Sequence, residues 1–371
     1  MNDKVVIMLD RVKHIFSVLV LLFLATGCDS TIHEYPTDPS IELRLSLEID
    51  NAAPEEFVVV KPGGGSGTSY IVRTQGAGQK GTRFDEPVKL RYIVDLYRVI
   101  ASNAQFVQRE VRWADPAQPI PDEVVFDIEA AEYKVLVWCD YVRESDPESS
   151  WYYNTDDLRN VRYADIEVKD NNDKDVFSSM LDLNFREYSY STHDYIIEKH
   201  MVLERPKGRY KVIATDCDKE SLHKMGIDNI TTIISYVLWV ADGYNVDEQM
   251  PNHFAETRSF YSVTSVDEVE SDGNLEMGYD FVFVNGKQTN VRLNFEFFKG
   301  VLTKGSDGKF YNEDGTLTTE KDKITTWTGI VVPLKRNMET VVEANFLKRS
   351  VGSGGIGIQP GFEGEIVVPW E

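Results

Sequence analysis

The sequence predicts an all-β protein made of β-sandwiches. Apolar and polar residues alternate strictly in several segments, most clearly from Ile41 to Asp50, as they do in half-buried strands. Asp-Gly turn pairs stand between strand-like runs at Asp307-Gly308 and Asp314-Gly315. No segment of ten or more residues has a convincing 3.6-residue apolar period. Many short strands with turn signals are typical of sandwiches, and 371 residues suit two domains, so we expect one sandwich in each domain.

The start of the chain has the pattern of an export signal. A basic flank precedes an apolar run of ten residues, Ile15 to Leu24, which is too short to cross a bilayer. The small residues Ala25 to Gly27 then precede Cys28 and resemble a lipobox, although the usual residue three places before the cysteine is leucine. We therefore predict a signal peptide over residues 1–27 and lipidation of Cys28. The alternative is an ordinary secretory signal followed by a chance cysteine.

A short tether and a strand follow the signal. Residues 28–40 contain two prolines and no periodicity, which predicts a lipidated tether. The next segment is expected to be a strand at the N-terminal edge of its domain, followed by a long glycine- and serine-rich loop from Pro62 to Gly81. The apolar face of the strand comprises Ile41, Leu43, Leu45, Leu47 and Ile49.

The strand pattern is interrupted once, and this interruption predicts a domain boundary. From Asp218 to Asn229 the sequence DKESLHKMGIDN has no alternation, whereas strand-like runs precede and follow it. We therefore expect an N-terminal β-sandwich domain over residues 41–218 and a C-terminal β-sandwich domain over residues 229–371.

Composition and motif content argue against several classes of function. The chain has 39 lysines and arginines against 61 aspartates and glutamates, so no basic excess exists to neutralise nucleic-acid phosphates. The histidines have no metal-ligand spacing, and no nucleophile motif occurs. A G-x-G-x-x-G match at Gly76 is followed by Pro87 and no helical period, which excludes a dinucleotide loop. We therefore expect no enzyme activity, no cofactor, no metal and no nucleic-acid partner.

Two cysteines remain beyond the predicted lipidation site. Cys139 and Cys217 could pair in an exported protein. A chain of this size does not need a disulfide to fold, which favours two buried thiols, and the sequence leaves both alternatives open.

One aromatic cluster is a candidate for carbohydrate contact. Trp151, Tyr152 and Tyr153 are adjacent in a polar, acidic connection. Exposed aromatic faces can stack on sugar rings, so glycan contact is one hypothesis for these side chains. The alternative is that the three side chains cap the edge of a sandwich.

Phrases spread over nearly the whole mature chain resemble the FimB-type fimbrial anchor family, whose members are lipoproteins that seat type V pili in the outer membrane. In the C-terminal half these are VLWVADGYNV at Val237, YDFVFVNG at Tyr279 and GGIGIQPGFEGEI at Gly354. In the N-terminal half they are CDSTIHEYP at Cys28 and YKVLVWCDY at Tyr133. The resemblance implies two transthyretin-like, Greek-key sandwiches in tandem, export as a lipoprotein, and assembly by donor-strand exchange.

Two segments suit strand exchange, in which a strand of one subunit completes a sheet of its neighbour. One is the alternating strand from Ile41 to Ile49. The other is the tail GEIVVPWE, with Ile366 and Val368 as its candidate residues. The resemblance also implies that shaft subunits lose their first strand to an arginine-specific protease, whereas an anchor must keep it. Arg73 and Arg83, in the glycine-rich region, are candidate cleavage positions.

The resulting hypothesis is a non-enzymatic lipoprotein of the cell outer membrane and the fimbrium. It would anchor or form part of a type V pilus and contact pilus shaft subunits. The sequence does not distinguish the anchor from the shaft role. The alternative hypothesis is a cell-surface polysaccharide-binding lipoprotein.

Overall fold

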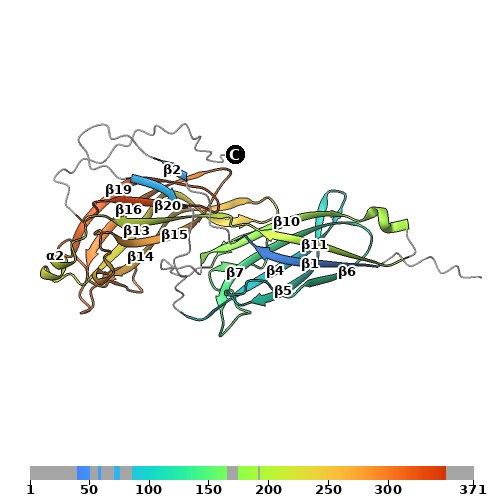
Figure 1. Ribbon diagram of the computed structural model, residues 1–371, viewed down its shortest axis with the longest axis horizontal. Coiled ribbons are helices and arrows are strands. Elements are labelled where there is room, and N and C mark those ends of the chain that lie inside the picture. Colours follow the sequence, from blue (N-terminus) through green and yellow to red (C-terminus); the bar gives the residue numbers. More distant parts are fainter. Residues whose placement is uncertain are drawn as a thin grey trace, which may run out of the picture.

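The protein is all-β, as predicted, and its strands form two β-sandwiches (Figure 1). The computed structural model describes residues 40–50, 57–59, 71–75, 86–164, 174–190 and 193–347. The helices that lie wholly within these ranges are short: α2 (Lys219–Lys224) and the 3-10 turns η2 (Arg186–Tyr190) and η3 (Val266–Glu268). None of them is long and apolar enough to span a bilayer.

The first sandwich packs a three-stranded sheet, in the order β11-β1-β6, on a four-stranded sheet, in the order β10-β7-β4-β5. Apolar side chains of both sheets share one core, with Leu43, Tyr92 and Val135 fully buried within it. The strands are β1 (Ile41–Ile49), β4 (Val88–Ile100), β5 (Asn103–Ala114), β6 (Val124–Ile128), β7 (Glu132–Arg143), β10 (Val176–Asn184) and β11 (Tyr195–Leu203).

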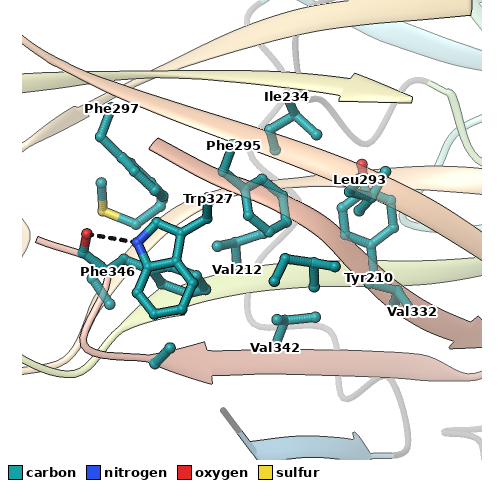
Figure 2. Packing of buried hydrophobic residues seen from close by; sticks show 14 of the residues in the cluster. Tyr210, Val212, Ile234, Leu293, Phe295, Phe297, Trp327, Val332, Val342 and Phe346 are labelled. Carbon is teal, nitrogen blue, oxygen red and sulfur yellow. Dashed lines mark hydrogen bonds between the residues drawn. The ribbon is translucent and has the colours of Figure 1, made fainter. Parts of the chain in front are cut away.

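The second sandwich has the larger core. Figure 2 shows Phe295, Phe297, Trp327 and Phe346 packed between its sheets, with the Trp327 indole N–H donating to the Phe346 carbonyl at 3.2 Å. Its sheets run in the orders β15-β12-β20-β3-β2 and β19-β16-β13-β9-β8, with β14 paired to β13. The main strands are β12 (Lys207–Ala214), β13 (Asn229–Asn245), β14 (Met250–Ser265), β15 (Leu275–Phe283), β16 (Thr289–Lys299), β19 (Lys323–Leu334) and β20 (Glu339–Ala344).

Both sandwiches have the same seven-strand topology. The first strand of each, β1 or β12, pairs antiparallel with the fourth and parallel with the last. The second strand, β4 or β13, pairs with the third and with the fifth, which pairs with the sixth. The strands β1, β4, β5, β6, β7, β10 and β11 thus correspond to β12, β13, β14, β15, β16, β19 and β20.

Two hairpins from the N-terminal half are added to the second sandwich. Strands β2 (Phe57–Val59) and β3 (Ile71–Gln75) extend it at β20, while β8 (Tyr153–Asn154) and β9 (Val161–Tyr163) extend it at β13. A third small hairpin, β17 (Thr303–Lys304) and β18 (Phe310–Tyr311), surrounds the predicted turn at Asp307-Gly308. The chain therefore passes from the first sandwich to the second and back twice, through β2–β3 and through β8–β9, before the first sandwich is complete.

The predicted linker is not where the two sets of strands divide. Asp218 caps helix α2, and Leu222 and Ile227 are buried in the second core. Strand β12 also belongs to the second sandwich, so the strands divide between Leu203 and Lys207. The alternation stops at Asp218 because helix α2 follows β12 and precedes β13 in the chain, and both of these strands belong to the second sandwich.

Candidate strand-exchange site

Strand β1 is the half-buried strand that the alternation predicts. Its five apolar side chains point into the first core and are at most 5% exposed, and Ile41, Leu43 and Leu45 are 0% exposed. Glu42, Arg44 and Ser46 point outward, and the Arg44 Nε donates to the Glu42 carboxylate at 2.6 Å. The two faces of the strand are therefore chemically distinct, and a slip by one residue would place charged groups in the core.

β1 is not an edge strand, although the sequence suggested one. It is parallel to β11 at nine successive positions and antiparallel to β6 at five. The backbone bond from the Tyr195 N–H to the Ser40 carbonyl, 3.0 Å, marks one end of the parallel ladder, and that from Asp50 N–H to the Leu203 carbonyl, 2.8 Å, marks the other. Removing β1 would leave a slot with backbone partners on both sides and five empty apolar positions.

The geometry of this slot defines what could fill it. Both neighbouring strands present unpaired backbone groups once β1 is absent, so an incoming strand gains hydrogen bonds on both edges. Five pockets at alternate positions require apolar side chains with a period of two residues. Burying one such side chain contributes roughly 1.5–3 kcal/mol, so all five matter to the first sandwich.

The other strand-exchange candidates, Ile366 and Val368, lie outside the described residues, as do Cys28 and Arg83. Arg73, which the glycine-rich sequence placed in a loop, lies in β3 and is paired with both β2 and β20.

The aromatic candidates for glycan contact are not exposed. Trp151 is 6% exposed, Tyr152 is 5% and Tyr153 is 0%, so the premise of exposed aromatic faces is wrong. They belong to a cluster, defined here as the junction cluster, that contains side chains from both sandwiches, including Trp138 and Phe283. Tyr153 packs edge-on to Trp138 at 5.4 Å between ring centroids. These aromatic residues join the two sandwiches.

A buried lysine at the junction cluster was not predicted from the sequence. Lys207, the first residue of β12, is 0% exposed. Its Nζ lies 4.4–4.7 Å from the ring centroids of Tyr153, Tyr163 and Phe283. It donates to both tyrosine hydroxyls, at 2.6 Å for Tyr163, and to the Lys174 carbonyl at 3.1 Å. Burial lowers the pKa of Lys207 well below its ordinary value.

A buried ion pair lies beside Lys207. The Lys174 Nζ is 2.8 Å from the Asp280 Oδ1, and the Tyr236 hydroxyl donates to Asp280 Oδ2 at 2.7 Å. Burial also raises the pKa of Tyr153 and Tyr236, so their hydroxyls stay protonated and keep donating. These contacts join residues far apart in the chain, which explains why no local sequence pattern marks them.

Both cysteines of the described chain are buried free thiols, Cys139 in the first core and Cys217 in the second. Burial raises the pKa of Cys139 well above its ordinary value and that of Cys217 to about 12. Among the described residues, no group of three or more histidines, cysteines and carboxylates is placed to hold a metal ion.

Residues 40–370 match a family of unknown function, DUF6562. The chain belongs to this family. No curated protein matches the sequence. This DUF6562 protein is similar in structure to the fimbrial anchor protein Mfa2 from Porphyromonas gingivalis, with 11% identity and a TM-score of 0.34 over 77% of this chain and 82% of that one. It is also similar to the tip fimbrial protein Mfa3 from the same organism, with 10% identity and a TM-score of 0.36 over 84% and 97% of the two chains. Scores at this level assign neither a partner nor a role to the DUF6562 chain.

Proposed function

We propose that this protein is a non-enzymatic structural lipoprotein of a type V pilus, held at the outer membrane through Cys28. The proposal rests on one observation, the position of β1 between β6 and β11. A strand with apolar side chains at alternate positions and partners on both edges is the kind of element that strand exchange replaces in a shaft subunit, and that holds the tether to the fold in an anchor. The resemblance to FimB-type anchors supports the same role.

Within that role, the anchor assignment is favoured over the shaft assignment. β1 is joined to the tether by Ser40, so loss of β1 would also detach Cys28 and its lipid. Arg44 lies mid-strand with neighbours on both sides, and a paired backbone is a poor protease substrate. Arg73 lies in a paired strand as well. The proposed anchor therefore keeps β1 and contacts shaft subunits by another surface or through the tail containing Ile366 and Val368.

The experiment is to identify the N-terminal residue of this protein in pili released from the cell surface. We expect lipidated Cys28, followed without a break by residues 29–50. A Cys28→Ser variant should be exported without a lipid, and its pili should appear in the medium. A mature chain that begins beyond Ile49 would refute the anchor role and support a shaft subunit.

A tail deletion tests the other exchange candidate separately. Removing residues 364–371 should abolish co-assembly with shaft subunits if this segment is donated. Unchanged co-assembly would exclude the tail and leave the anchor role to be decided by the N-terminal residue. The polysaccharide-binding alternative is not proposed further, because its candidate side chains are buried.

A further inference from the structure

One buried ion pair joins the two sandwiches and has no part in the proposed function. Lys174 precedes β10 of the first sandwich by two residues, and Asp280 lies in β15 of the second. The Lys174 Nζ is 2.8 Å from the Asp280 Oδ1, and the two side chains are 3% and 11% exposed. An amine and a carboxyl group from opposite sandwiches are therefore held in contact and nearly out of solvent.

Side-chain chemistry distinguishes this pair from the other buried ion pairs. Arg91 with Asp140 and Arg205 with Asp175 are as deeply buried. A guanidinium group stays protonated and is no nucleophile, whereas a lysine amine that has lost its proton attacks carbonyl carbon. In every other lysine–carboxylate pair of the described chain, at least one side chain is 21% or more exposed. Among the described residues, burial, a possible nucleophile and an acyl group therefore coincide at this pair alone.

Both oxygens of the Asp280 carboxyl group accept hydrogen bonds. The backbone N–H of Phe281 donates to Oδ1 at 2.8 Å, and the Tyr236 hydroxyl of β13 donates to Oδ2 at 2.7 Å. Donors in these positions fix the carboxyl group. They would also stabilise the negative charge that develops on its oxygens when a nucleophile adds to Cγ.

The lysine is held at its backbone and at its amine. Its backbone carbonyl accepts hydrogen bonds from the Lys207 Nζ, at 3.1 Å, and from the Tyr153 hydroxyl. Its own Nζ lies 4.6 Å from the centroid of the Phe260 ring, which is 7% exposed. Groups held together in a reactive geometry can reach an effective concentration of about 10⁵–10⁸ M. The fixed contact therefore lowers the barrier to a reaction between this amine and this carboxyl group.

Burial also favours the protonation states that react. Two ions removed from water carry a desolvation penalty that their mutual attraction offsets only in part. Transfer of one proton from the Lys174 ammonium group to the Asp280 carboxylate removes both charges. A neutral amine then lies beside a neutral carboxylic acid, and an amide formed from them leaves no charge to be compensated inside the protein.

We propose that Lys174 and Asp280 form a modification site, at which the folded chain joins the two side chains in an amide bond. The Lys174 nitrogen adds to the Asp280 Cγ, one amine proton passes to the departing hydroxyl group, the Cγ–O bond breaks and one water molecule leaves. The reaction consumes no oxidant, cofactor or second protein. The bond links positions 106 residues apart in the chain and joins the two sandwiches covalently. It depends on the junction alone, so it forms whether or not the chain belongs to a pilus.

Mass spectrometry tests the bond directly. The lipid-free chain from Asp29 to Glu371, measured after denaturation, should be lighter than its sequence by the mass of one water molecule. After digestion with trypsin, the segments that contain Lys174 and Asp280 should be recovered as one branched peptide, because trypsin does not cut after an acylated lysine. The branched peptide identifies the site of water loss and distinguishes it from dehydration elsewhere in the chain.

Three variants relate the bond to the geometry. Lys174→Arg keeps the positive charge but cannot form the amide, so it should have its full sequence mass. Lys134→Arg is the matched control and should keep the mass deficit, because Lys134 and its partner Asp247 are 21% and 19% exposed. Tyr236→Phe removes one donor to the carboxyl group, so the cross-linked fraction at a fixed time after synthesis should be lower than in the wild type. Circular dichroism verifies that each variant is folded.

Two results would overturn the proposal. One is a wild type with its full sequence mass and with separate tryptic peptides for the two positions. The other is a mass deficit that persists in folded Lys174→Arg, because the water would then have been lost at another site.

Discussion

Deletion of β1 provides the most direct test of the slot between β6 and β11. A chain lacking residues 40–50 loses five side chains that are at most 5% exposed. At roughly 1.5–3 kcal/mol for each buried side chain, their transfer to water costs about 8–15 kcal/mol, which is an upper estimate. A whole domain is typically stable by about 5–15 kcal/mol. We therefore expect the first sandwich to unfold without β1 while the second stays folded.

Complementation by a peptide makes this prediction specific. A synthetic peptide of residues 40–50, added to the shortened chain, should restore the lost unfolding transition in circular dichroism. A peptide with Leu45→Asp should fail, because that side chain faces the core and is 0% exposed. A peptide with Ser46→Asp should succeed, because that side chain faces solvent. The reasoning is refuted if the shortened chain keeps both transitions, or if the two peptides act equally.

Three further substitutions test buried charge and backbone strain. Burial lowers the pKa of Lys207, so just below the ordinary lysine pKa, roughly 10.4, the folded protein binds fewer protons than the unfolded chain. The free energy of unfolding of the wild type, relative to Lys207→Met, should therefore rise in urea titrations as the pH approaches about 10. Arg91→Met should lower the free energy of unfolding by about 3–5 kcal/mol in urea titrations, because Asp140, which is 1% exposed, loses its only ion-pair partner among the described residues. Adding Asp140→Leu to this variant should restore most of the lost stability. Leu238 has φ +80°, a backbone conformation that glycine adopts without strain. Leu238→Gly should therefore increase the free energy of unfolding by about 1 kcal/mol and raise the thermal midpoint, whereas Val237→Gly should lower it.

The sequence predicted those features of the fold that depend on neighbouring residues. The alternation from Ile41 to Ile49 correctly gave a half-buried strand. The turn at Asp314-Gly315 is confirmed as well, since the Gly315 N–H donates to the Asn312 carbonyl and Gly315 has φ +78°. The apolar period of a strand and the residue types of a turn are local properties of the sequence, so both can be recognised before the fold is known.

Features that depend on distant residues were not predictable. The partner of Ser46 across the parallel ladder is His200, 154 positions away. Tyr153 is buried because its ring packs against Trp138 and contacts Lys207, 54 positions away. An aromatic residue in a polar segment gives no indication of such a partner. The burial and the partners of these side chains therefore depend on contacts between distant strands, which no local sequence pattern encodes.

The position of β1 has a mechanical consequence for the proposed anchor. Tension between the membrane and the pilus would enter the fold at Ser40 and pull β1 along its own length. Because β1 is paired at nine positions with β11 and at five with β6, such a pull loads these rungs in shear, together rather than one after another. A strand at the edge of the sheet would resist the same pull through one ladder only. A central first strand therefore suits a protein that must hold a filament under load.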